Sequence, residues 1–223
     1  GIKELTDYCG KVNKGRKKEG LEPFKPIIGC EMYVAHRRKE DRDKNRGDMS
    51  GYHLIVLAKN YNGYKNLIKL VSNSWVDGYY MRPREACEWY HHLFGDDYYL
   101  ELQRHKVPDD PRILANREAY DLQQRANKVL IEFAKEYGIK LICTNDCHFE
   151  DKETAEAHDH LLCLATGKDL DDPNRMRYSK QEWFKTREEM NEVFSDIPEA
   201  LSNTLDIYNK VEIYSIDHGP IMP

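Results

Sequence analysis

Asp146 and His148 are the residues whose types and spacing most directly suggest chemistry. They lie in the segment Leu-Ile-Cys-Thr-Asn-Asp-Cys-His-Phe of residues 141–149, directly after an apolar run, Lys140 to Cys143, that predicts a buried strand. Ligands of parallel α/β proteins bind at the carboxyl ends of strands, and side chains two positions apart in an extended chain leave on one side. A carboxylate and an imidazole placed in this way predict half of a divalent-metal site. A polar turn, with Asp146 capping a helix and His148 at the surface, explains the segment equally well.

Two more residues could complete such a site. Glu31 follows the apolar residues 27–30, and a buried carboxylate costs free energy unless it is paired or binds a metal. His53 opens the apolar run of residues 52–58, although a single histidine beside a strand is more often structural. Four oxygen or nitrogen ligands on three predicted strand segments suit Zn²⁺, Mn²⁺ or Fe. The predicted metal ligands are therefore Glu31, His53, Asp146 and His148.

The other histidines are weaker candidates for chemistry. His105 follows a predicted strand at residues 97–104 and is an outside candidate for the same site. Several of the rest lie on helical patterns, so we interpret them as surface or packing residues. These are His91, His92, His158 and His160.

Composition and charge narrow the classes of function. The chain has 223 residues, of which 40% are hydrophobic and 33% are charged, and its formal net charge is −5. That composition is typical of a globular domain, and the charge provides no basic surface for tight, independent DNA binding. No apolar run is long enough to span a bilayer, and no signal peptide is recognisable. Six cysteines without a CxxC pair indicate reduced thiols, so we expect a cytoplasmic protein.

The apolar periodicity predicts alternating strands and helices. This alternation favours a parallel α/β fold and is compatible with closure into a barrel. The stretch from His36 to Ser50 is almost wholly charged or polar, so we expect a weakly packed, mobile loop. Strands are predicted at 25–35, 52–58, 97–104, 140–143 and 211–214. Helices are predicted at 2–20, 62–76, 85–93, 112–137, 154–166, 188–194 and 198–209.

Several blocks along the chain carry a family resemblance. They are KPIIGCEMYV (25–34), YHLIVLAKNYNGYKNLIKLVS (52–72), GDDYYLELQRH (95–105), CTNDCHF (143–149), AHDHLLCLATGKDLDDPNRMRYS (157–179), EEMNEVFSDIPEALSNTLDI (188–207) and YSIDHGPIMP (214–223). In combination they resemble the PHP (polymerase and histidinol phosphatase) domain of the bacterial replicative DNA polymerase III alpha subunit. The resemblance covers essentially the whole chain.

The resemblance implies a fold and a metal site. PHP domains of this kind are distorted seven-stranded β/α barrels that hold up to three metal ions at the carboxyl ends of the strands, where intact sites hydrolyse phosphoesters, including the removal of 3′ nucleotides. It also implies that residues 1–223 are a PHP domain whose segment from about residue 179 leads out of the barrel toward the polymerase core. The positions that match family metal ligands are Glu31, His53, Asp146 and His148.

The resemblance also implies partners. The parent protein would be a DNA-directed DNA polymerase that uses Mg²⁺ and works on DNA with a proofreading exonuclease subunit and other replicase subunits, without a membrane. A scaffold that docks the exonuclease, with no chemistry of its own, is the alternative. A free-standing PHP phosphatase fits less well, because residues 157–207 and the tail after Val211 resemble the polymerase lineage.

Two departures from the family pattern affect the expected site. The family's opening His-x-His pair and its Thr-Asp-His segment are missing, and Arg84 runs directly into Glu85 where the family has a further strand with a Cys or His ligand. We therefore expect an incomplete barrel that lacks its first strands and one internal strand–helix unit. We also expect this chain alone to be inactive as a hydrolase.

Overall fold

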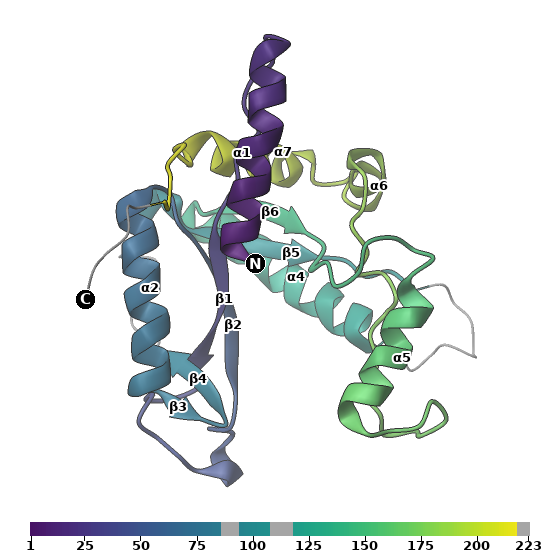
Figure 1. Cartoon of the computed structure of the whole chain (residues 1–223). Coiled ribbons are helices and arrows are strands. Elements are labelled where there is room, and N and C mark those ends of the chain that lie inside the picture. The colour runs from purple at the N-terminus through teal and green to yellow at the C-terminus, as the bar shows by residue number, and fades with distance from the viewer. Residues whose placement is uncertain (86–93, 108–117, 218–223) are drawn as a thin grey trace. The chain divides into compact units, whose positions relative to one another are not determined.

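The described part of the chain has a mixed α/β fold. The structure is a computed structural model that describes residues 1–85, 94–107 and 118–217 (Figure 1). Its strands form one sheet of four strands and one of two, and neither of these is closed. The prediction of an α/β fold is confirmed at this level.

The chain divides into two compact units. Unit 1 comprises Gly1–Leu93 together with Ile207–Pro223, and unit 2 comprises Phe94–Asp206. Each unit has its own cluster of buried hydrophobic residues. Glu31 and His53 therefore belong to unit 1, whereas Asp146 and His148 belong to unit 2.

Unit 1 contains a sheet with the strand order β2-β1-β4-β3. Its described elements are α1 (Ile2–Lys18), β1 (Gly29–Ala35), η1 (Lys44–Arg46), β2 (Gly51–Leu57), α2 (Tyr61–Val76), β3 (Tyr79–Tyr80) and β4 (Arg82–Glu85). β1 pairs parallel with β4 but antiparallel with β2. The prediction of a parallel arrangement is wrong for β1 and β2. Only a loop with the short η1 joins them, whereas parallel strands need a long crossover connection.

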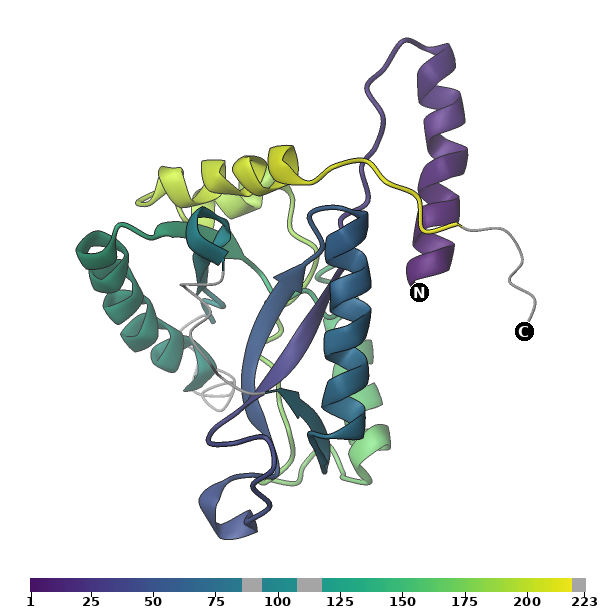
Figure 2. The same cartoon turned by 90° about the vertical axis from the view of Figure 1, so that its left-hand side faces the viewer.

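Helix α2 packs against one face of this sheet and creates the core of unit 1 (Figure 2). Alternate residues of a strand point to opposite faces, and Met32 points to the face that α2 covers. Leu67 of α2 is buried against Met32 and Ala58. The helix starts where the side chain of Asn60 accepts a hydrogen bond from the Gly63 amide at 3.0 Å.

The charged loop between β1 and β2 is held by buried polar groups. The Asp48 side chain is fully buried, and it pairs with the Arg37 guanidinium at 2.5 Å and accepts from the Asp43 amide at 2.7 Å. Arg84 of β4 is also fully buried and donates to the carbonyl oxygens of Lys39 and Asp41, each at 2.9 Å. Most residues of this loop are exposed, as the prediction of weak packing expects, and Asp48 is the buried exception. The mobility of the loop stays a prediction.

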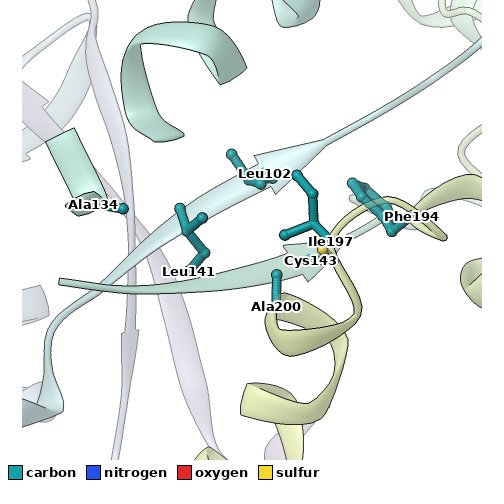
Figure 3. Packing of buried hydrophobic residues seen from close by; sticks show 7 residues of the cluster. All are labelled: Leu102, Ala134, Leu141, Cys143, Phe194, Ile197 and Ala200. Atoms are coloured by element: carbon teal, nitrogen blue, oxygen red, sulfur yellow. The ribbon is translucent and has the colours of Figure 1, made fainter. Parts of the chain in front are cut away.

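Unit 2 is built around the parallel pair β5 and β6. Its described elements are η2 (Gly95–Asp97), β5 (Tyr99–Gln103), α4 (Glu118–Tyr137), β6 (Lys140–Thr144), α5 (Ala155–Thr166), α6 (Arg187–Val193) and the first turns of α7 (Pro198–Lys210). Leu102 and Cys143 lie opposite each other on the two strands. Figure 3 shows them in one cluster with Leu141 of β6, Ala134 of α4 and three residues between the end of α6 and the first turn of α7, namely Phe194, Ile197 and Ala200.

Two predicted elements differ from the structure, and one observed hairpin was not predicted. Residues 211–214, predicted as a strand, follow α7 as chain without regular secondary structure. The helix predicted from Glu85 does not begin there, because Glu85 ends β4, and the rest of that helix lies outside the described residues. The short hairpin of β3 and β4 was not predicted. It depends on Met81, which has a positive φ of 63° that the sequence gives no reason to expect.

None of the helices within residues 1–85, 94–107 and 118–217 is long and apolar enough to cross a membrane.

Candidate metal centre

Glu31 and His53 form a pair on the sheet of unit 1. The Nδ1 atom of His53 lies 2.9 Å from Oε1 of Glu31, and both side chains are about half exposed. Glu31 alternates with Met32 and therefore points to the sheet face opposite the one that α2 covers. Tyr33 contacts the edge of the His53 ring at a centroid distance of 4.9 Å, and the Arg82 guanidinium lies over Tyr33 at 5.4 Å.

The position of this pair differs from the prediction. Glu31 is the third residue of β1 and His53 is the third residue of β2, so both lie within strands rather than at their carboxyl ends. The antiparallel register places His53 directly opposite Tyr33, one diagonal step from Glu31. The two side chains therefore meet because of strand register.

Asp146 and His148 follow the carboxyl end of β6, as predicted. The chain is not extended there, because Asp146 has a positive φ of 44°. The turn still brings the two side chains together, with His148 Nδ1 3.8 Å from Asp146 Oδ1 and 2.7 Å from the Asp146 carbonyl oxygen. Of the alternative reading, the helix cap is wrong, since the next helix, α5, begins at Ala155 after Thr154. The polar turn and the exposed position of His148 that it expected are confirmed.

A buried network holds the turn that carries Asp146 and His148. The side-chain amide of Asn145 donates to the carbonyl oxygens of Gln181 at 2.9 Å and Trp183 at 2.7 Å. The amide of His148 donates to the carbonyl oxygen of Glu182 at 2.8 Å. The turn is therefore fixed by main-chain atoms of a segment more than thirty residues away in the sequence.

The side chain of His105 is also part of this hydrogen-bond network. Its side chain is buried, with Nε2 3.0 Å from the Asn145 carbonyl oxygen and Nδ1 3.0 Å from Nε2 of Gln123. Burial lowers the pKa of His105, so the ring is neutral, and the Gln123 amide donates to Nδ1 while Nε2–H donates to the carbonyl. His105, an outside candidate for the metal site on sequence grounds, is therefore a structural support of the turn.

Two residues near the turn were missed by the sequence reasoning. The Tyr178 hydroxyl lies 3.1 Å from Nε2 of His148, and its ring packs against His148 and His158. Lys185 has Nζ 3.4 Å from the centre of the Trp183 ring, and its burial lowers its pKa to about 8. In the sequence, the only sign of the Lys185–Trp183 contact is the spacing of these two residues, which stand two positions apart. The interpretation of His158 as a packing residue is confirmed.

The donor atoms of both pairs fit a divalent metal. Carboxylate oxygens and imidazole nitrogens are ligands of Zn²⁺, Mn²⁺ and Fe. Within residues 1–85, 94–107 and 118–217, however, potential ligands do not form a group of three or more. Unit 1 carries the Glu31–His53 pair and unit 2 carries the Asp146–His148 pair, and the convergence of these two pairs on one cluster stays a prediction.

Comparison with known sequences extends these observations. Residues 2–91 match the family described as PHP domain. The chain is 36% identical over 263 residues to "DNA polymerase III subunit alpha" of Borreliella burgdorferi, an alignment that covers 98% of this chain and 22% of the relative. Proteins of the same name from Campylobacter jejuni and Thermus aquaticus are each 33% identical, over 93% and 88% of this chain and 21% and 18% of their own.

The alignments also show how much of each relative corresponds to this chain. The chain spans about a fifth of the length of the relatives it matches. The alignment with the Borreliella protein covers 263 residues, more than the 223 of this chain, so the relative has residues inside the aligned region without a counterpart here. This agrees with the prediction that an internal segment of the family pattern is missing, and the place of that segment stays a prediction.

Proposed function

Because the chain belongs to the PHP-domain family and is a relative of bacterial DNA polymerase III alpha subunits, we propose that it is the PHP part of a replicative DNA polymerase. The shared sequence carries this proposal, since it runs through both compact units and is not confined to one motif. The whole protein would be a cytoplasmic DNA-directed DNA polymerase that uses Mg²⁺ to join nucleotides on a template. Its partners would be DNA, a proofreading exonuclease subunit and other replicase subunits.

The proposal extends to the architecture. The strands of both units would be part of a distorted seven-stranded β/α barrel. Residues 1–223 would form the PHP domain, and the segment from about residue 179 would lead out of the barrel toward the polymerase core. The parallel pairing of β5 with β6, with candidate ligands directly after β6, supports this arrangement.

Glu31, His53, Asp146 and His148 would hold Zn²⁺, Mn²⁺ or Fe. A bound metal ion would supply Lewis acidity, which lowers the pKa of a water molecule and neutralises charge on a phosphodiester. The chain's own contribution is orientation: Glu31 fixes the His53 ring, and the carbonyl of Asp146 fixes the His148 ring. The buried Asn145 keeps the second pair in place.

The full-length protein provides the test of this function. With Mg²⁺ and a primed template, we expect it to extend the primer, and an Asp146→Asn variant to extend equally well. Removal of 3′ nucleotides in Zn²⁺ or Mn²⁺ should fall at least tenfold in Asp146→Asn, because a ligand carboxylate is lost. Asp171→Asn changes an exposed carboxylate and serves as the control. A full-length protein that cannot extend a primer contradicts the proposal.

The chain alone should behave differently from the full-length protein. Hydrolysis at a multi-metal site needs ions about 3.5–4 Å apart, and the described residues offer potential ligands only in pairs. We expect the purified 223-residue chain to leave a 3′-recessed duplex intact in Zn²⁺ or Mn²⁺. Robust cleavage that Asp146→Asn abolishes would show instead that these four residues suffice.

A scaffold role is the second candidate function. Leu161 and Leu164, three positions apart on α5, are 61% and 80% exposed, and two neighbouring exposed leucines suit a protein partner. Under this proposal the PHP part docks the proofreading exonuclease subunit. Co-migration of the two proteins in size-exclusion chromatography should be lost in Leu164→Glu and kept in Lys152→Glu, which changes an exposed lysine. Equal co-migration of both variants contradicts docking through α5.

A further inference from the structure

The two ring nitrogens of His148 have different neighbours. Nδ1 lies 2.7 Å from the carbonyl oxygen of Asp146, and a carbonyl oxygen can only accept a hydrogen bond. Nδ1 therefore carries the proton, and Nε2 has the free lone pair. That lone pair is the only position on the ring from which a neutral His148 can bind a metal ion.

The Tyr178 hydroxyl is directed at this same atom. Its oxygen lies 3.1 Å from Nε2 of His148, and because Nε2 is an acceptor, the hydroxyl is the donor. The two rings lie with their centroids 4.6 Å apart, and the ring of His158 on α5 packs against both, 5.2 Å from Tyr178 and 6.0 Å from His148. The contact is thus part of a packed aromatic cluster.

The chain on both sides of Tyr178 is anchored. Three residues earlier, Arg175 forms a two-bond ion pair with Asp159 of α5, at 2.5 and 2.8 Å, and both side chains are buried. One residue later, Ser179 is buried and its amide donates to the Glu182 carboxylate at 3.1 Å. The position of the Tyr178 hydroxyl is therefore set by the fold of unit 2.

We infer that the Tyr178 hydroxyl and a divalent cation compete for Nε2 of His148. One lone pair cannot accept a hydrogen bond from Tyr178 and bind a cation at the same time, so binding of the cation requires the hydroxyl to be displaced. Tyr178 thereby lowers the metal affinity of the Asp146–His148 pair and holds the His148 ring when the pair is empty. This inference rests on the proposed function, because it takes His148 to be a metal ligand.

The first arm of the experiment needs no metal. The ¹⁵N resonances of His148 in the metal-free 223-residue chain report the tautomer and the hydrogen bond at Nε2. We expect the Nδ1–H tautomer in the wild type and in Tyr178→Phe. The Nε2 resonance should move in Tyr178→Phe toward that of a nitrogen without a strong donor. An unchanged Nε2 resonance, or an Nε2–H tautomer in the wild type, overturns the inference.

The second arm measures Zn²⁺ affinity by competition with a chelating dye, with the His148 resonances showing where Zn²⁺ binds. Tyr178→Phe should bind about two- to tenfold more tightly than the wild type, because one hydrogen bond no longer has to be broken. Tyr208→Phe removes a hydroxyl elsewhere and should bind as the wild type does. Equal or weaker binding by Tyr178→Phe overturns the competition alone. No Zn²⁺ response at His148 in any variant overturns the competition together with the metal site of the proposed function.

Discussion

The two carboxylate–histidine pairs are presented by different kinds of structure. Glu31 and His53 project from adjacent antiparallel strands, and strand register alone brings them to 2.9 Å. Asp146 and His148 lie on a turn with a positive φ, and buried polar groups of several segments hold that turn. The first pair therefore depends on backbone fit within a sheet, whereas the second depends on satisfied hydrogen bonds. Substitutions that disturb either the backbone fit or the buried hydrogen bonds should therefore lower stability to different extents.

The largest expected effect concerns the buried Arg175–Asp159 ion pair in unit 2, the unit that also carries Asp146 and His148. Arg175→Met leaves the Asp159 carboxylate buried without its main partner, so the free energy of unfolding should fall by about 3–5 kcal/mol. Lys168→Met removes one partner of the exposed pair with Asp172 and should cost less than about 1 kcal/mol. Urea unfolding of both variants provides the measurement. Similar losses would mean that burial of the charges does not matter.

A smaller effect is expected from the turn itself. Asn145→Ala removes two donors and leaves the carbonyl oxygens of Gln181 and Trp183 without them, which should cost about 2–3 kcal/mol. Asn174 is exposed, and its replacement by Ala should change the free energy of unfolding by less than about 0.5 kcal/mol. If denaturant unfolding shows no difference between the two variants, the buried network does not hold the turn.

A single added methyl group should lower the stability of the β1–β2 strand pair that carries Glu31 and His53. A Cβ atom at Gly51 would lie 2.3 Å from the carbonyl oxygen of Val34, so Gly51→Ala should destabilise the β1–β2 pair by about 1–3 kcal/mol. At Gly10 in α1 a Cβ atom meets nothing within 4 Å, and Gly10→Ala should stabilise by about 0.5–1 kcal/mol. Thermal unfolding measures both. A Gly51→Ala variant as stable as the wild type would show that β1 and β2 can adjust their backbones to a side chain at this position.

The smallest expected effect is a dependence on pH. Burial lowers the pKa of His105 in the folded chain below its value in the unfolded chain, so the unfolded state takes up a proton first as the pH falls. His105 therefore stabilises the fold fully above about pH 6.5 and loses that contribution as the pH falls toward its folded pKa. His105→Gln should flatten the stability profile between about pH 7 and 5, measured by chemical unfolding at each pH. His160→Gln, at an exposed position, should leave the profile unchanged, and an unaltered slope in His105→Gln contradicts this account.

Structural features that depend on local sequence patterns were predicted correctly. The apolar run before Thr144 placed Asp146 and His148 correctly after a strand, and Gly167 marked the end of α5. The antiparallel pairing of β1 with β2 was missed, because the charge of the connecting loop says nothing about the buried Asp48 that closes it. The role of His105 was also missed, since its partner Gln123 comes from a separate helix.

The contacts of Arg84 have a consequence for how the charged loop can vary. Arg84 holds this loop through the main-chain oxygens of Lys39 and Asp41, which every amino acid possesses. The side chains between Arg38 and Arg42 can therefore be exchanged, in natural variants or by design, without loss of these two bonds. Both bonds come from Nη2, while Nε of the same guanidinium donates to the carbonyl oxygen of Gly78 at 3.3 Å. A lysine has one nitrogen and could not make the Gly78 bond and the loop bonds from separate atoms, so the tolerance of the loop depends on the Arg84 guanidinium.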